Sequence, residues 1–370
     1  MGSSSTDIGD RLYEVVDEYA TLGDHRTGSS TDAATRGWFA ARLESRRASV
    51  DTTSYDFERY DATASVTIDG RDVPSLPVFY SGTGTVGSST PFVGEVDVAR
   101  VLEEPLDECL VAAHAVGAPV AVLATKDPNG RLVARNRSLD RSPGPPAVLV
   151  AGRELDALRD GSVRVDVEAR IVPGRSETVV ARFGSEHGPP LVITTPLTGW
   201  FSCAGERGTG IAIAIEIAAS LAARVPVLVV GTTGHELEHL GARAYLEQAD
   251  LAPRAVVHLG ASLAAGDRGD DGVLTLGALR FAFLDGVGPT EAVVRAALAP
   301  AEVTLMTGLR QWPGEGEEWR KLGAPVLSFV GGFDRFHTAD DITEAVTEPA
   351  LLTRVHDAVL GAALAVSEGL

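Results

Sequence analysis

The sequence predicts an α/β fold in which a mostly parallel mixed sheet is covered by helices on both faces and carries a smaller β-rich inserted domain. The first reason is an alternation of apolar strand-like segments with helical segments, which is typical of parallel sheets buried on both sides. The strand-like segments are 189–196, 226–232, 254–262 and 324–332, and the helical ones are 208–224, 240–248 and 349–366. The second reason is length, because 370 residues exceed the usual size of a single core.

The front of the chain predicts two helices followed by strands. Residues 7–22 and 31–47 have helical periodicity, acidic starts and arginine-rich ends, which suit the helix dipole. Residues 50–80 alternate like strands, and 75–90 form a linker rich in Gly, Ser and Thr. We assign 1–74 to the N-terminal part of the main domain.

The middle of the chain has a different character. It contains a helix that ends at Gly117, the strand VAVLATK, a polar loop, the strand AVLVAG and a short helix in ELDALRDG. This order resembles the protease-associated domain, a β-rich insertion. The resemblance predicts an insertion over 75–170 and a return to the main domain over 171–370, where 175–184 is expected to form a hairpin-like pair.

Composition limits the partners. The formal net charge is −19, with 44% hydrophobic and 22% charged residues. A nucleic acid or an anionic membrane needs clustered Lys and Arg, so neither is expected as a partner. We expect a small-molecule or short-peptide substrate, and we leave open whether the chain forms a homodimer.

Cysteine content and the N-terminus predict a cytoplasmic protein. Only Cys109 and Cys203 occur, which is too few for a secreted disulfide framework. The start of the chain lacks the basic and apolar regions of a signal peptide, and no uncharged apolar stretch of about 18 residues predicts a membrane span. Richness in Ala, Gly, Val and Arg suggests a bacterium with a GC-rich genome.

Residues 226–241 carry the main chemical motif. The apolar run 226–232 predicts a buried strand, and chemistry in α/β folds lies at the carboxyl ends of such strands. The next residues, HELEH, match a zinc-binding pattern in which two His one helical turn apart bind the metal. Because Gly234 and a strand precede the motif, we favour the alternative that His235 and Glu236 face the site while His239 lies at the periphery, on the following helix.

The whole chain resembles the zinc aminopeptidases of metallopeptidase clan MH, which also include glutamate carboxypeptidases and glutaminyl cyclases. The resemblance rests on HRTGSSTDAATRGWFAARLES at 25–45, GRSETVVARFG followed by GPPLVITTPLTGW, CAGERGTGIAIAIEIA, HELEHLGARAYLE, and FHTADDITEAV at 336–346. The last motif is the most specific. The resemblance implies a zinc-aminopeptidase type of fold and metal-dependent hydrolysis.

The metal ligands of that family are only partly present. Its first His corresponds to Pro196 and the nearby Asp to Thr198, so the resemblance does not imply a complete two-zinc site. Its catalytic Glu corresponds to His235. The family's second Asp corresponds to Val257, His258 or Gly260, depending on the register.

The residues that survive imply one zinc ion. Glu206 replaces the bridging Asp, and with Glu236 and His337 it gives the three-ligand pattern of the glutaminyl cyclases. Two carboxylates and one imidazole suit Zn²⁺ and leave a position for water or substrate. The alternative is that zinc has been lost, and that Glu206 and Arg207 then form an internal ion pair.

Other residues are assigned from this arrangement. His235 is expected to act as general base, and His258 or Arg207 to stabilise an oxyanion. Trp200, Phe201 and His239 are expected to line the substrate pocket. Asp340 and Asp341 are expected to orient His337 or to cap the next helix.

Three functions remain open from the sequence. The first is an atypical aminopeptidase-like hydrolase of an amide or peptide bond in a small substrate, working through one metal ion. The second is a non-hydrolytic tailoring enzyme resembling a cyclotransferase, in which an internal nucleophile replaces water. The third is a metal-free pseudo-peptidase that binds ligands in the old cleft. Because several ionisable groups are retained at the predicted site, we favour an enzyme.

Overall fold

The predicted α/β architecture is confirmed in a computed structural model of the chain. The structure describes residues 5–87, 89–98, 104–137, 139, 144–184, 188–285, 288 and 290–369. The main sheet has ten strands, nine of them in the order β15-β14-β16-β11-β9-β10-β8-β1-β2, and β4 also pairs with β8. The other part of the molecule contains a four-stranded sheet in the order β3-β7-β6-β5.

The middle of the main sheet is parallel. Its apolar strands are β9 (Leu191–Pro196), β10 (Val227–Thr232), β11 (Ala255–Leu259) and β16 (Val326–Gly332). β9 pairs in parallel with β10 on one side and β11 on the other, and β11 pairs in parallel with β16. The carboxyl ends of these four strands therefore meet at one edge of the sheet.

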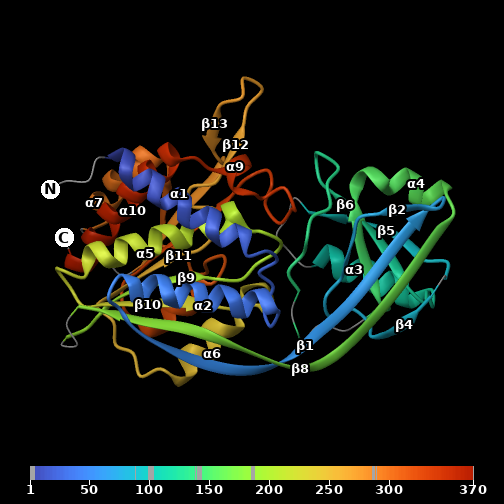
Figure 1. The fold of residues 1–370 in the computed structure, drawn as a ribbon, viewed down its shortest axis with the longest axis horizontal. Helices are drawn as coiled ribbons and strands as arrows, with labels where there is room; N and C mark the ends of the chain where they lie inside the picture. Colours follow the sequence, from blue (N-terminus) through green and yellow to red (C-terminus); the bar gives the residue numbers. More distant parts are fainter. Residues whose placement is uncertain are drawn as a thin grey trace.

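Helices cover both faces of this sheet (Figure 1). One face carries α1 (Ser5–Thr21), α2 (Ser30–Ser45), α5 (Thr209–Leu221), α7 (Thr290–Leu298) and α10 (Pro349–Glu368). The other face packs against α6 (Leu240–Gln248) and α8 (Gly316–Trp319), where Tyr245 and Trp319 enter the core. The short helix α9 (Thr343–Val346) precedes α10.

Two long strands connect the main body to the second part of the molecule. β1 (Ser49–Ile68) and β8 (Val163–Phe183) pair antiparallel along their whole length, and both run from one part into the other (Figure 1). The second part contains β3 (Ser75–Pro77), β5 (Phe92–Asp97), β6 (Ala121–Lys126), β7 (Ala147–Ala151), α3 (Glu104–Ala115) and α4 (Leu155–Asp160). The short strands β2 (Arg71–Val73) and β4 (Gly84–Val86) pair with the long ones.

Two local predictions were incomplete. The hairpin expected at 175–184 is one end of the single strand β8, which continues through Pro173 and Gly174 because its full-length pairing with β1 continues through them. The sequence also did not indicate four strands between the neighbouring motifs. They are β12 (Gly266–Arg268), β13 (Leu274–Leu276), β14 (Leu279–Asp285) and β15 (Thr304–Thr307).

Within the described ranges, α10 is the one helix long and apolar enough to cross a membrane. In the structure, 56% of its apolar window is buried inside the protein. It packs against α1, α5 and α7, and Leu352, Val359 and Ala362 belong to the main core.

Candidate functional site

The ionisable residues predicted from the sequence gather at the carboxyl ends of β9, β10 and β11. Glu206 and Arg207 lie in a π-helical turn, Ala204–Gly208, that leads into α5. His235 and Glu236 follow β10, and His258 lies within β11. His337 comes from the loop after β16, and its φ of 60° places it in the left-handed region.

The HELEH segment does not form the helix of a zinc-binding HExxH motif. Residues His235–Leu237 form a single 3₁₀ turn, and Glu238 and His239 then adopt left-handed φ angles of 55° and 60°. Gly234 starts the turn with a φ of 74°, and a Cβ there would meet the Tyr55 hydroxyl at 2.9 Å. His239 caps α6, with its ring centroid 4.9 Å from that of His235.

Glu206 lies between Arg207 and His337. Its carboxylate accepts a bond from Arg207 Nη2 at 2.6 Å and lies 3.3 Å from Nε2 of His337. Burial raises the pKa of Glu206, but the charges of Arg207 and His337 outweigh burial and bring this pKa down to about 2. Arg207 also donates to the backbone oxygens of Thr198 and Gly260, at 3.1 and 3.4 Å. The internal ion pair considered from the sequence is therefore formed.

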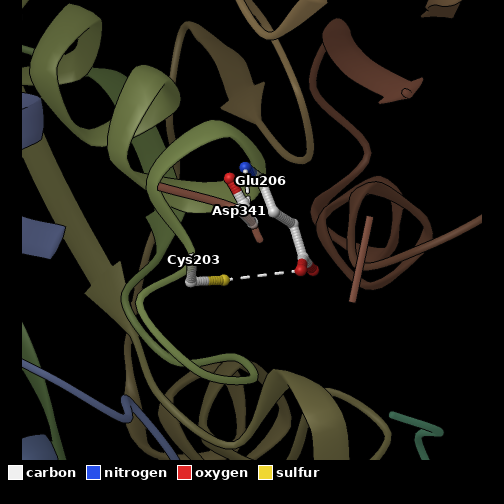
Figure 2. A group of neighbouring side chains, drawn as sticks. All are labelled: Cys203, Glu206 and Asp341. Carbon is white, nitrogen blue, oxygen red and sulfur yellow. Dashed lines mark hydrogen bonds between the residues drawn. The ribbon is translucent and has the colours of Figure 1, made fainter. Parts of the chain in front are cut away.

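The described residues contain one group of three potential ligand atoms that lie within 4.8 Å of one another: Cys203, Glu206 and Asp341. Figure 2 shows the Cys203 thiol pointing to the Glu206 carboxylate, with a distance of 3.4 Å. Burial raises the pKa of this thiol well above its ordinary value. The Asp341 carboxylate instead accepts the backbone N–H of Glu206 at 3.1 Å (Figure 2). It also accepts the backbone N–H of Gly205 at 2.6 Å.

Asp341 therefore fixes the turn before α5 and does not orient His337, as was one of its expected roles. The group that orients His337 is the backbone of the second part of the molecule. Nδ1 of His337 lies 3.2 Å from the Ala134 carbonyl oxygen, and the Ala134 N–H donates to the His337 carbonyl at 2.8 Å.

Glu236 is directed away from Glu206 and His337. One carboxylate oxygen accepts the Thr27 backbone N–H at 2.6 Å, and the other accepts the Thr198 hydroxyl at 2.9 Å. Burial raises the pKa of Glu236. The residue ties the loop between α1 and α2 to the end of β9.

These contacts do not fit a zinc ion at the predicted ligands. The Glu206 carboxylate is neutralised by a guanidinium that is buried beside it, so a second cation there would be repelled. Both ring nitrogens of His337 already face oxygens of the protein, the Ala134 carbonyl and the Glu206 carboxylate. Glu236 uses both oxygens elsewhere. The three-ligand zinc site remains a sequence prediction, and we derive no chemical step through it.

His235 is paired with a buried carboxylate, that of Glu315. Its Nδ1 lies 3.3 Å from Oε2 of Glu315, and Oε1 of Glu315 accepts the Thr232 hydroxyl at 2.7 Å. Glu315 is buried, at 1% exposure. Burial lowers the pKa of His235 well below 6.5, and the charge of Arg207 lowers it further. His235 is therefore a neutral imidazole near pH 7.

Two further imidazoles lie close by. His239 Nδ1 is 3.9 Å from Oε1 of Glu318, at the mouth of the site. His258 is buried, and burial lowers its pKa to about 3. Within the described part of the chain, its Nδ1 has no hydrogen-bond partner.

A small cavity lies beside Glu236 and Leu237, with about 20 Å³ of space, room for about one water molecule. Trp200 lines it and also packs against Phe79, with ring centroids 5.2 Å apart. Phe201 is partly buried near Trp200 and is not among the lining residues. His239 contacts His235 and Glu318 rather than this cavity.

Sequence reasoning missed Glu315. It lies in the segment PGEGEEW, between short glycine-flanked turns, and no motif of the resemblance covers it. The sequence offered only a weak signal for Glu315. The residue is a Glu between two glycines, a few residues before the predicted strand 324–332.

No protein-family model and no curated protein sequence matches the chain. Solved structures do match. A zinc aminopeptidase from Bacillus subtilis aligns with a TM-score of 0.74 at 14% identity, over 96% of this chain and 94% of that one. The chain has the zinc-aminopeptidase fold. The resemblance inferred from the sequence is thus confirmed at the level of fold.

Two other structures share this aminopeptidase fold. A peptidase precursor from Shewanella amazonensis gives a TM-score of 0.71 at 17% identity, over 98% of this chain and 96% of that one. A glutaminyl cyclase from Porphyromonas gingivalis gives a TM-score of 0.53 at 14% identity, over 98% of each chain. Because these identities are low, the likeness concerns the fold.

Proposed function

We propose that the chain is a peptidase-like hydrolase that cleaves an amide bond of a small substrate, with His235 as general base and no metal ion at Glu206. The contact that carries this proposal is the 3.3 Å approach of His235 Nδ1 to Glu315 Oε2. A carboxylate on Nδ1 holds the hydrogen there and leaves the lone pair on Nε2. The fold likeness to peptidases supports the reaction class.

The proposed step uses residues of this chain alone. Nε2 of His235 takes a proton from water while the water oxygen bonds to the amide carbon. The C–N bond then breaks, and the proton passes from His235 to the leaving nitrogen. The buried positive charge of Arg207, which already lowers the pKa of His235, favours the negative charge that develops on the carbonyl oxygen.

The test is turnover of aminoacyl amides and N-terminal glutaminyl peptides, followed by mass spectrometry. We expect His235→Gln to lower kcat at least about 100-fold, the usual contribution of a general base, and Glu315→Gln to lower it in the same direction. Glu318→Gln is the matched control, because Glu318 contacts His239 and not His235. Unchanged turnover in His235→Gln contradicts the proposal.

The same product analysis separates the proposed hydrolase from the two other candidates. Ring-closed products from the glutaminyl peptides would support a cyclotransferase. The similarity of the fold to that of a glutaminyl cyclase favours this second candidate. Binding without any product supports a pseudo-peptidase. The observation that favours this last function is the Glu206–Arg207 ion pair. In it, Arg207 binds the carboxylate of Glu206, the residue that the resemblance aligns with the bridging Asp of the family.

A further inference from the structure

Glu315 reaches His235 from a short element that packs closely on the sheet. It directly precedes α8, whose other end is fixed by Trp319, a fully buried side chain in the core between the sheet and α6. The contacts of the Glu315 carboxylate, with Thr232 and His235, are made at the tip of the side chain. They hold the carboxylate, but they do not explain how the backbone of Glu315 comes so near to the strand ends.

The residue after Glu315 accounts for this approach. A Cβ on Gly316 would lie 2.6 Å from Cβ of Ser328, nearer still to its Oγ, and 3.5 Å from Cδ2 of His258. The first two separations are much shorter than a non-bonded contact, and turning the hydroxyl would not relieve the one to Cβ. Ser328 of β16 pairs with His258 of β11, so their side chains stand next to each other on one face of the sheet. Gly316 therefore lies in a notch between these two side chains that has no room for a side chain of its own.

The contribution of Ser328 to this contact is its small size. The residue is fully buried, and its hydroxyl has no hydrogen-bond partner among the residues that the structure describes. The contact with Gly316 is therefore one of shape rather than of polar bonding. Because the interior is closely packed, a larger side chain on either residue would push α8 away from β16 and move Glu315 with it.

We propose that Gly316 and Ser328 are positioning residues for the His235–Glu315 pair. Their close packing sets how deeply α8 lies on the sheet, and thereby the 3.3 Å separation between Nδ1 of His235 and the Glu315 carboxylate. Both residues act through Glu315, as the supporting packing around a reactive group does. Resting on the proposed function, this extends the catalytic machinery to a second layer that no motif of the sequence indicated.

The test reads the tautomer of His235 by nitrogen NMR of the full chain labelled at its histidines, with His235→Gln to assign the signal. In the wild type, the Glu315 carboxylate should hold the hydrogen on Nδ1. Gly316→Ala should shift His235 towards the other tautomer, because the added Cβ displaces Glu315, and should lower kcat about 10–100-fold. Ser328→Val adds bulk to the other side of the same contact and should have the same two effects.

Two further variants separate positioning from general destabilisation. The double variant Gly316→Ala with Ser328→Gly moves the side chain across the contact and should restore the wild-type signal of His235. Gly9→Ala is the matched control, because a Cβ there would meet the Pro349 carbonyl at 2.5 Å, between α1 and α10 on the opposite face of the sheet. It should lower the unfolding temperature without changing the His235 signal.

An unchanged His235 tautomer in Gly316→Ala, or no recovery in the double variant, would overturn the proposal. If Gly316→Ala does not fold, an unchanged tautomer in Ser328→Val overturns it equally. The tautomer is read without substrate, so the result does not depend on turnover. If the tautomer follows the contact but the wild type cleaves no amide, the hydrolase proposal fails and the positioning role stands.

Discussion

Arg207 keeps its charge in the interior, with 1% of its side chain exposed, because Glu206 lies 2.6 Å away. Taking both charges out of water is costly, and only their mutual attraction with good hydrogen bonding offsets that cost. Arg207 also donates to two backbone oxygens. Arg207 therefore neutralises the carboxylate of Glu206, the residue that the sequence resemblance aligns with a bridging Asp.

Removal of one member of this ion pair should destabilise the folded protein. We expect Glu206→Gln to lower the free energy of unfolding by about 3–5 kcal/mol, because it leaves the buried guanidinium of Arg207 without its anion. The measurement is urea denaturation. Glu216→Gln, which removes the partly exposed partner of Arg11 and Arg46, should cost less than about 1 kcal/mol. If both variants lost a similar, small amount of unfolding free energy, the buried Glu206–Arg207 pair would not stabilise the fold as described.

His25 predicts a dependence of stability on pH. Burial lowers its pKa from 6.5 to about 4, and its ring stacks on Tyr19 with centroids 3.8 Å apart. Because the unfolded chain takes up this proton at a higher pH than the folded one, stability is lost as pH falls from about 6.5 towards 4.

Between pH 7.5 and 5, His25 should account for a loss of roughly 2 kcal/mol. His25→Asn should reduce the measured loss by about that amount, since Asn does not titrate. The same denaturation series at both pH values tests this, with the exposed His114→Asn as control. An unchanged pH dependence in His25→Asn would show that His25 is not the source.

The residue roles were only partly predictable from the sequence. Glu206 and His337, which the family resemblance grouped as ligands, lie 3.3 Å apart. Glu236 could not be placed correctly, because its partners are a loop N–H at Thr27 and a hydroxyl at Thr198, contacts that depend on tertiary structure. Glu315 was missed because the His235 contact spans 80 residues of sequence.

At the scale of elements, the segment 129–137 links the second part of the molecule to the site. Asn129 and Arg131 bind Asp334, and Ala134 pairs with His337 through both backbone groups. Trp200, on the other side of the site, donates to Asn136 at 2.7 Å. This segment therefore holds two loops of the main body in place.

Loss of one of these contacts should loosen the loop that carries His337. We expect Arg131→Ala to speed amide hydrogen exchange at 334–338 by about tenfold, because Arg131 donates to the Asp334 carbonyl at 2.6 Å. Hydrogen-exchange mass spectrometry measures this. Arg153→Ala, which changes a mostly exposed arginine of the same part of the molecule, should leave the exchange unchanged. Equal exchange in wild type and Arg131→Ala would refute the link.

Elements with a strong periodic pattern were predicted well, and short ones were not. The apolar strands β9, β10, β11 and β16 and the helices α1, α2, α6 and α10 lie within a few residues of their predicted bounds. β12 and β13 have three residues each, so their sequences carry no periodic signal. Their pairing with each other is a tertiary property.

At the scale of the whole molecule, the fold is that of the zinc aminopeptidases, while several residues at the candidate site differ from the family pattern given by the sequence resemblance. The structural match covers 96% of the chain, so the architecture is retained throughout. Three of the positions that carry metal chemistry in the family resemblance hold Pro196, Glu206 and His235 in this chain, and they lie where β9 and β10 end or just before α5. The packed core determines where the strands end, but it does not determine which residues occupy those ends. The residues of such a site can therefore change while the fold is retained.

The most direct test of the account is zinc stoichiometry. The purified chain is incubated with zinc, dialysed and analysed for metal, together with Glu206→Gln and His337→Asn, and its thermal unfolding is compared with and without a chelator. The account predicts far less than one zinc per chain and the same unfolding temperature in both conditions. About one zinc per chain, lost in both variants, would contradict it.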